Sequence, residues 1–173
     1  HAAFTNMRHH GGSLSDIAIL VIDINDGIKP QTTEVLQILK ASKTPFIIAL
    51  NKVDNISGWQ THESKLITKS ILSQRTNVKT HFDEKFYIII GALHSHGIQA
   101  ELYSEISDFT KSIAIIPCSA HTTEGISEIL AILTALAQKF LHDKIKRNKQ
   151  PKATILEVKR NKQGNFIETI LHD

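Results

Sequence analysis

The sequence has 173 residues, of which 41% are hydrophobic and 21% are charged, and its formal net charge is +3. This length fits one domain, or one domain and the beginning of another, and no stretch approaches the ~20 apolar residues of a membrane-spanning helix. The small positive charge does not by itself establish a nucleic-acid-binding surface. Cys118 is the only cysteine, which excludes an intrachain disulfide and is typical of a reducing compartment. We therefore expect a cytoplasmic protein that has neither a membrane nor DNA as a partner.

The first part of the chain predicts a helix, a strand and a second helix. Residues 1–10 have apolar side chains at helical spacing, and two glycines follow them. Residues 17–22 form an uninterrupted apolar run, as in a parallel strand that is buried on both faces. Pro30 suits the first position of a helix, which the apolar spacing extends to about Ala41. Because the sequence begins inside a structured pattern, we expect it to be the middle of a longer protein.

The next strand ends in a polar tetrad. Residues 45–50 are apolar and rich in isoleucine, and Asn51-Lys52-Val53-Asp54 follows directly. The carboxyl ends of parallel strands face a ligand crevice, so the tetrad is a candidate binding site. Asp54 can accept hydrogen bonds from the ring N1–H and the exocyclic amine of guanine, a pair of donors that adenine lacks. Asn51 can hold the loop together and reach the base edge, and the stem of Lys52 can cover the ring. The alternative for the tetrad alone is a solvated surface turn.

Residues 55–112 form a long excursion before the next strand. Apolar side chains recur at helical spacing over 66–72 and again over 86–93, which predicts a helical insertion. We expect Trp59 to anchor this insertion on the body of the domain, and the alternative is a surface for a partner. His94 and His96 are two positions apart, which on a helix points their rings in different directions. We therefore predict no metal site.

The last part of the chain predicts a third core strand, a long helix and a hairpin. Residues 113–117 are apolar and lead into Cys118-Ser119-Ala120, and an amphipathic helix is expected over 126–145. Residues 148–152 have the composition of a linker. From residue 153 the apolar period changes to two, with a turn at 161–165, so residues 153–173 predict a β-hairpin that opens an all-β domain.

The two loops that follow neighbouring strands are more specific together than either is alone. Loops from adjacent parallel strands meet at the same edge of the sheet, so Ala120 is expected beside Asn51–Asp54. The backbone N–H of Ala120 can donate to O6 of guanine, an acceptor that adenine replaces with an amine. The pair of loops therefore predicts a guanine-binding α/β fold.

The residues around these loops resemble the GTPase domain of the translation initiation factor 5B family, the archaeal and eukaryotic relatives of bacterial initiation factor 2. The resemblance covers essentially the whole chain, including the insertion and the hairpin. It is carried by the stretches His1-Ala-Ala-Phe-Thr-Asn-Met-Arg, Gly11-Gly12-Ser13-Leu14-Ser15-Asp16-Ile17, Asp26-Gly27-Ile28-Lys29-Pro30-Gln31-Thr32 and Gly58-Trp59.

The resemblance implies a P-loop GTPase-like parallel sheet, of which this chain holds the carboxyl-terminal part: three core strands with helices and the helical insertion. Residues 1–147 would then be a partial GTPase domain, 148–152 a linker, and 153–173 the start of an all-β barrel, domain II. The implied function is that of a GTP-binding translation initiation factor that promotes initiator tRNA placement and joining of the ribosomal subunits. Its implied partners are GTP or GDP, the ribosome and initiator tRNA.

The family's site residues can be carried over position by position. The tetrad residues Asn51, Lys52 and Asp54 match the base-specificity motif, and Ser119 with Ala120 matches the second base-contacting loop. Two histidines are also candidate site residues. His121 occupies a variable position and is expected to stack on the base, and His1 matches the histidine that orients the attacking water during hydrolysis.

The sequence also departs from the family pattern. The phosphate-binding G-x-x-x-x-G-K-[ST] loop and the magnesium-binding threonine are absent, so we expect magnesium binding and GTP hydrolysis only in the full-length protein. The strand over 17–22 would be left as an exposed apolar edge. Thr123 stands where the family usually has glycine, a difference expected to alter the base-side loop. Two other functions remain open: the guanine-binding half of a split GTPase, and a non-catalytic interaction module.

Overall fold

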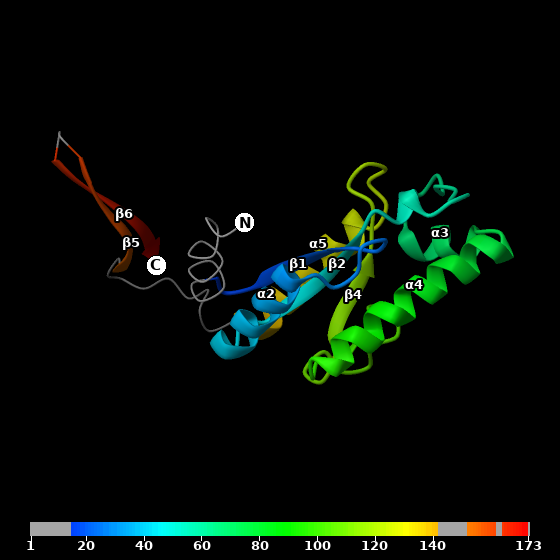
Figure 1. Cartoon of the computed structure of the whole chain (residues 1–173), viewed down its shortest axis with the longest axis horizontal. Coiled ribbons are helices and arrows are strands. Elements are labelled where there is room, and N and C mark those ends of the chain that lie inside the picture. The colour runs from blue at the N-terminus through cyan, green and yellow to red at the C-terminus, as the bar shows by residue number, and fades with distance from the viewer. Residues whose placement is uncertain (1–14, 142–151, 162–163, 173) are drawn as a thin grey trace.

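The computed structural model describes residues 15–141, 152–161 and 164–172. The described residues form an α/β body with a four-stranded parallel sheet in the order β1-β2-β4-β3 (Figure 1). Its strands are β1 (Ala18–Asp23), β2 (Phe46–Asn51), β3 (Ala100–Leu102) and β4 (Ile113–Pro117). A separate antiparallel hairpin is formed by β5 (Lys152–Asn161) and β6 (Gly164–His172). The mixed α/β class with a parallel sheet is as predicted.

The three apolar runs predicted to be core strands are strands β1, β2 and β4, and the predicted hairpin is β5 with β6. The strand β3 was not predicted, because it has only three residues, Ala-Glu-Leu, and no apolar run marks it. It forms through tertiary pairing, in parallel register with the beginning of β4. The sheet therefore has a fourth strand, contributed by the insertion.

The helices are α2 (Pro30–Ser42), α3 (Ile67–Ser73), α4 (Thr76–Ser95) and α5 (Ile126–Phe140). The helix α2 begins at Pro30, where the fixed φ of proline favours helix initiation, and ends before Lys43, which has a left-handed backbone. The insertion is helical as expected, since it contains α3 and α4. A short 3-10 turn, η2 (Val53–Asn55), carries the end of the tetrad.

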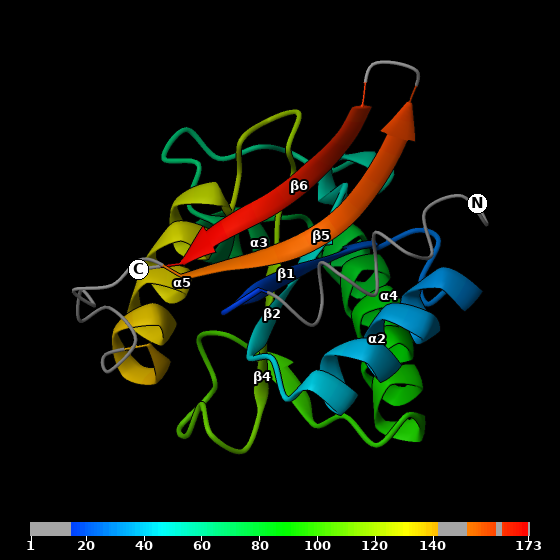
Figure 2. The same cartoon turned by 90° about the vertical axis from the view of Figure 1, so that its left-hand side faces the viewer.

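Helices cover both faces of the sheet (Figure 2). On one face, Leu36 of α2 and Leu93 of α4 belong to a single buried cluster with the sheet. On the opposite face, Ile129 of α5 packs with Ile47 of β2 and Ile116 of β4. Burial on both faces explains why the central strands read as continuous apolar runs rather than alternating ones.

The strand β1 lies at the edge of the sheet among the described residues, as its pairing with β2 alone requires. Ile19 is 43% exposed and Val21 is 60% exposed, although both are large and apolar. The predicted exposed apolar edge is therefore present in this part of the structure.

Several predictions fall on positions outside the described residues. These are the helix at 1–10, the linker at 148–152 apart from Lys152 at the start of β5, and the helix beyond residue 141. The division into a partial GTPase domain and the start of a barrel stays a prediction. None of the helices in residues 15–141 is both long enough and apolar enough to span a membrane.

Candidate functional site

The candidate site lies at the carboxyl edge of the sheet, where β2 and β4 end side by side. Their parallel register places Leu50 opposite Pro117, so the tetrad and the loop after β4 leave the sheet together. The N–H of Val53 donates to the carbonyl of Cys118 at 3.2 Å, which joins the two loops directly. The structure thus brings together the two segments that the sequence analysis paired.

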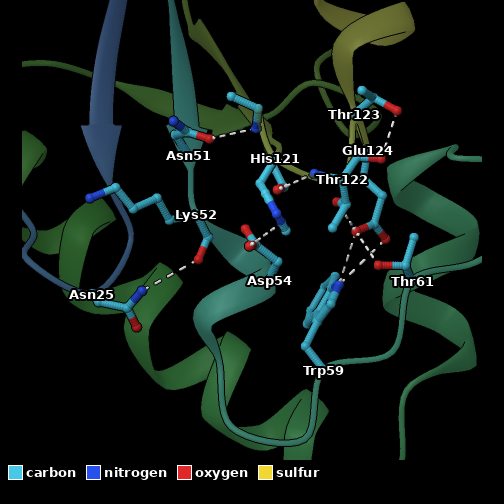
Figure 3. Close-up of polar contacts among 12 residues, drawn as sticks. Asn25, Asn51, Lys52, Asp54, Trp59, Thr61, His121, Thr122, Thr123 and Glu124 are labelled. Atoms are coloured by element: carbon cyan, nitrogen blue, oxygen red, sulfur yellow. Dashed lines mark hydrogen bonds and ion pairs between the residues drawn. The ribbon is translucent and has the colours of Figure 1, made fainter.

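Asn51 connects the two loops through its side chain (Figure 3). Its Oδ1 accepts a hydrogen bond from the backbone N–H of Ala120 at 3.0 Å and one from the thiol of Cys118 at 3.9 Å. The Ala120 N–H, which was expected to donate to guanine O6, therefore has a protein acceptor in this structure. A base would have to share this donor with Asn51 or displace its amide oxygen.

Lys52 reaches toward the end of β1. Its Nζ lies 2.8 Å from Oδ2 of Asp23, and its backbone carbonyl accepts a hydrogen bond from Asn25 at 3.4 Å. Burial alone would raise the pKa of Asp23, but the bonds from Lys52 and from the N–H of Asn25 outweigh it and hold this pKa below its ordinary value. The hydrogen bond to Asp23 in turn raises the pKa of Lys52. The lysine is thus held by charge at the rim of the site.

Asp54 lies in the 3-10 turn with its side chain only 17% exposed, and His121 stands beside it. The Nδ1 of His121 is 3.6 Å from Oδ2 of Asp54, and the histidine side chain is 88% exposed. An open cavity of about 380 Å³ is lined by Asn51, Lys52, Asp54, Asn55, Ala120 and His121. All predicted base-site residues except Ser119 line this cavity.

Ser119 is fully buried and shapes the loop from inside. Its Oγ accepts a hydrogen bond from the N–H of Thr122 at 3.0 Å, and its own N–H donates to the carbonyl of Glu124 at 2.9 Å. The preceding residue, Cys118, is also buried, and burial raises the pKa of its thiol to about 12. Both side chains therefore support the loop, whereas the cavity is lined by Ala120 and His121.

The carboxylate of Glu124 is a further polar centre behind the cavity. It accepts hydrogen bonds from Oγ of Ser70 at 2.5 Å, from Oγ1 of Thr122 at 2.6 Å and from Oγ1 of Thr61 at 2.9 Å. The indole N–H of Trp59 lies 3.4 Å from both carboxylate oxygens. Trp59 also packs against Phe82 of α4, within the insertion, and against the buried cluster that includes the sheet. Because it contacts both this cluster and Glu124, Trp59 anchors the insertion on the body of the domain, as predicted.

The cavity offers the chemistry that a guanine base requires. The Asp54 carboxylate can accept two hydrogen bonds from adjacent donors, and Ala120 carries the nearby backbone N–H for an acceptor. Among the described side chains of residues 15–141, no three His, Cys, Asp or Glu converge to hold a metal ion. The lining of the cavity fits a base. His1, the predicted water-orienting residue, lies outside the described residues.

Comparison with known proteins identifies the family. Residues 1–139 match the family model described as the elongation factor Tu GTP binding domain. The chain belongs to the elongation factor Tu GTP-binding domain family. This match covers the four strands of the parallel sheet and both loops of the candidate site.

Relatives of this GTP-binding domain carry the name of an initiation factor. The chain is 48% identical to a probable translation initiation factor IF-2 of Methanopyrus kandleri and 45% identical to that of Archaeoglobus fulgidus, over 176 residues each. These alignments cover 100% of the chain but 29% and 30% of the relatives. The chain thus spans less than a third of the curated relatives it matches. The predicted resemblance to the translation initiation factor 5B family is confirmed.

Solved structures agree with this assignment. The GDP-bound aIF5B of Aeropyrum pernix is similar with a TM-score of 0.84 and 40% identity, over 99% of this chain and 29% of that one. The elongation factor SelB of Methanococcus maripaludis in complex with a GTP analogue has a TM-score of 0.61 at 21% identity, over 99% of this chain and 31% of that one. The second likeness concerns the fold alone.

Sequence reasoning missed four residues around the site of this GTP-binding domain: Asp23, Asn25, Asn55 and Glu124. Asp23 follows an apolar run and lies opposite Asn51 at the carboxyl end of a parallel strand. Because the carboxyl ends of parallel strands face the ligand crevice, this position could have marked Asp23 as a site residue. Glu124 gives no such signal, because three of its donors lie 54, 63 and 65 positions away in the chain. Only the packing of the insertion brings these groups together.

Proposed function

We propose that this chain is the base-reading part of a GTP-binding translation initiation factor. The observation that carries this proposal is the cavity in which the Asp54 carboxylate and the Ala120 backbone come from adjacent parallel strands. Asp54 would accept from N1–H and the 2-amine of guanine, and the Ala120 N–H would donate to O6. Asn51 would hold the two loops in register, and Lys52 would cover the ring with its methylene stem. The GDP-bound relative supports guanine nucleotide as the ligand.

The wider role belongs to the same proposal. The relatives named translation initiation factor IF-2 support a role in translation initiation, with the ribosome as a partner. Within that role we propose placement of initiator tRNA and joining of the ribosomal subunits, the processes that the family resemblance implies. A cytoplasmic location follows, since translation takes place there. GTP hydrolysis, with magnesium and with His1 orienting the attacking water, would require the phosphate-binding loop, which this sequence does not contain.

Exchange of Asp54 for asparagine tests the base-reading role. In Asp54→Asn, the amide can donate to the 2-carbonyl of xanthine but loses one acceptor for guanine. Affinity for fluorescently labelled GDP should fall about 100-fold, because two hydrogen bonds to a charged group are disrupted, while affinity for the xanthine analogue should rise. Equilibrium titration followed by fluorescence measures both.

The matched control is Asp83→Asn on α4, outside the candidate site. It removes the same charge and should leave both affinities unchanged. Equal GDP binding by the Asp54→Asn and Asp83→Asn proteins would contradict the proposal. If the wild-type chain bound no guanine nucleotide at all, an interaction module would be the better description.

A further inference from the structure

The buried carboxylate of Glu124 is the most heavily bonded side chain near the candidate site. Its residue has no exposed surface, and four side chains donate hydrogen bonds to it. Figure 3 shows three of these donors, Trp59, Thr61 and Thr122. Burial alone would raise its pKa, but the hydrogen bonds from Ser70, Thr122, Thr61 and Trp59 outweigh this and lower it below its ordinary value. An ionised carboxylate with all its donors in place is a rigid centre, because each unmade bond would leave a buried charge poorly satisfied.

The four donors come from two different parts of the molecule. Trp59, Thr61 and Ser70 belong to the insertion, from its first turn to the middle of α3. Thr122 belongs to the loop that follows β4. A backbone hydrogen bond joins the same two segments: the N–H of Gly125 donates to the carbonyl of Lys65 at 3.1 Å. The insertion and the base-side loop are therefore fastened to each other at this point.

The same bonds fix the turn that presents Ala120. Thr122 is held on one side by Glu124 and on the other by Oγ of Ser119, which accepts its N–H at 3.0 Å. Ser119 is itself tied to the backbone carbonyl of Glu124. Ala120 and His121 thus lie in a short loop between Ser119 and Thr122, and both of these residues are hydrogen-bonded to Glu124.

We propose that Glu124 is a positioning residue for guanine selection, which fixes the Ala120 N–H at the place where it meets O6 by tying Thr122 to the insertion. This inference rests on the proposed function, because it assigns a determinant of selectivity to the same base-binding cavity. It also gives the insertion a role: the segment from Trp59 to Ser70 supports the base-side loop from behind.

Two base analogues separate the positioning of Ala120 from the rest of the site. In 6-thio-GDP, sulfur replaces O6 while N1–H and the 2-amine remain, so the ratio of GDP to 6-thio-GDP affinity reports the Ala120 N–H. In IDP the 2-amine is missing and O6 remains, so the ratio of GDP to IDP affinity reports Asp54. A change in overall stability would affect both ratios alike. A change in the ratio of GDP to 6-thio-GDP affinity alone therefore reports the position of the Ala120 N–H.

Three variants of the chain are compared by competition with fluorescently labelled GDP. Glu124→Gln removes the charge, and Thr122→Val removes only the bond from the loop to Glu124. The control is Thr134→Val on α5, which loses a hydroxyl bond of 2.7 Å to the carbonyl of Leu130 and does not line the cavity. Thermal unfolding, followed by the fluorescence of Trp59, establishes the temperature at which every variant is folded.

The expected result is a preference for GDP over 6-thio-GDP of about tenfold in the wild type, corresponding to one good hydrogen bond. Glu124→Gln and Thr122→Val should reduce this preference to about twofold or less, while the preference for GDP over IDP stays unchanged and Thr134→Val behaves as wild type.

If Glu124→Gln is too unstable to assay, Thr122→Val alone decides, since it leaves the carboxylate and its other three donors in place. An unchanged preference for GDP over 6-thio-GDP in Thr122→Val, or a parallel loss of both preferences, would overturn the positioning role. Failure of the proposed function has a different signature: wild-type protein that binds GDP no better than IDP or ADP.

Discussion

Thr123 and Gly125 both have left-handed backbone conformations, with φ of +66° and +77°. A β-branched residue is strained in this region, whereas glycine is not. This explains in physical terms why the family resemblance places glycine at the position of Thr123. At Gly125 the restriction is stronger, because a Cβ atom there would collide with the carbonyl oxygen of Pro117 and approach Cys118 to 3.0 Å.

Substitutions at these two positions should therefore change the stability differently. Gly125→Ala should lower the free energy of unfolding by about 3 kcal/mol, from the left-handed backbone and the backbone clash together. Thr123→Gly should raise it or leave it unchanged, because relief of about 1 kcal/mol of strain is offset in part by the entropy of glycine. Urea unfolding measures both, and a Gly125→Ala protein as stable as wild type would contradict the observed loop geometry.

At the scale of elements, α3 depends on a cap that comes from another helix. Its N-cap residue, Leu66, provides no side-chain hydrogen bond. Instead, Oε1 of Glu128 on α5 accepts the N–H of Ile67 at 2.8 Å, and Oε2 accepts the hydroxyl of Ser127 at 2.8 Å. A carboxylate at this place accepts a hydrogen bond from a backbone N–H that has no partner within the helix. Its negative charge also interacts favourably with the positive end of the helix dipole.

Removal of this cap should loosen α3. Glu128→Ala should cost about 1 to 2 kcal/mol in the free energy of unfolding, the usual value for loss of a helix cap. Amide hydrogen exchange should accelerate in α3 more than in α2. The matched control is Glu84→Ala on the exposed side of α4, which should change stability by less than about 0.5 kcal/mol. Equal unfolding midpoints for the two variants would argue against the cap.

Elements with a local signal were predictable from the sequence, and elements that depend on distant contacts were not. The apolar runs at 17–22, 45–50 and 113–117 predict strands. Because helices cover both faces of the sheet, a central strand buries consecutive side chains and its sequence is continuously apolar. The strand β3 has no local signal, since its three residues become a strand only beside β4. The cap on α3 is likewise invisible in sequence, because Glu128 and Ile67 are 61 positions apart.

At the scale of the whole molecule, the sheet explains why the site could be anticipated. Parallel register between β2 and β4 carries Asn51–Asp54 and Ser119–Ala120 to one edge, as expected for adjacent strands. Which atoms then meet could not be foreseen. The hydrogen bond from Ala120 to Asn51 joins residues 69 positions apart in the chain. The hydrogen bonds to Glu124 from Trp59, Thr61 and Ser70 form only when the insertion packs against the loop after β4.

The proposed function places the guanine base between the tetrad and the loop after β4. Titration of the ¹⁵N-labelled chain with GDP, followed by two-dimensional NMR, tests it most directly. We expect the largest amide shifts at Ala120, Lys52 and Asn55, with the Ala120 signal moving because its N–H turns from Asn51 to the base. Residues at the opposite end of the sheet, such as Phe46 and Ala114, should stay in place. Saturable binding of GDP that left the Ala120 amide signal unshifted would contradict guanine binding at this site.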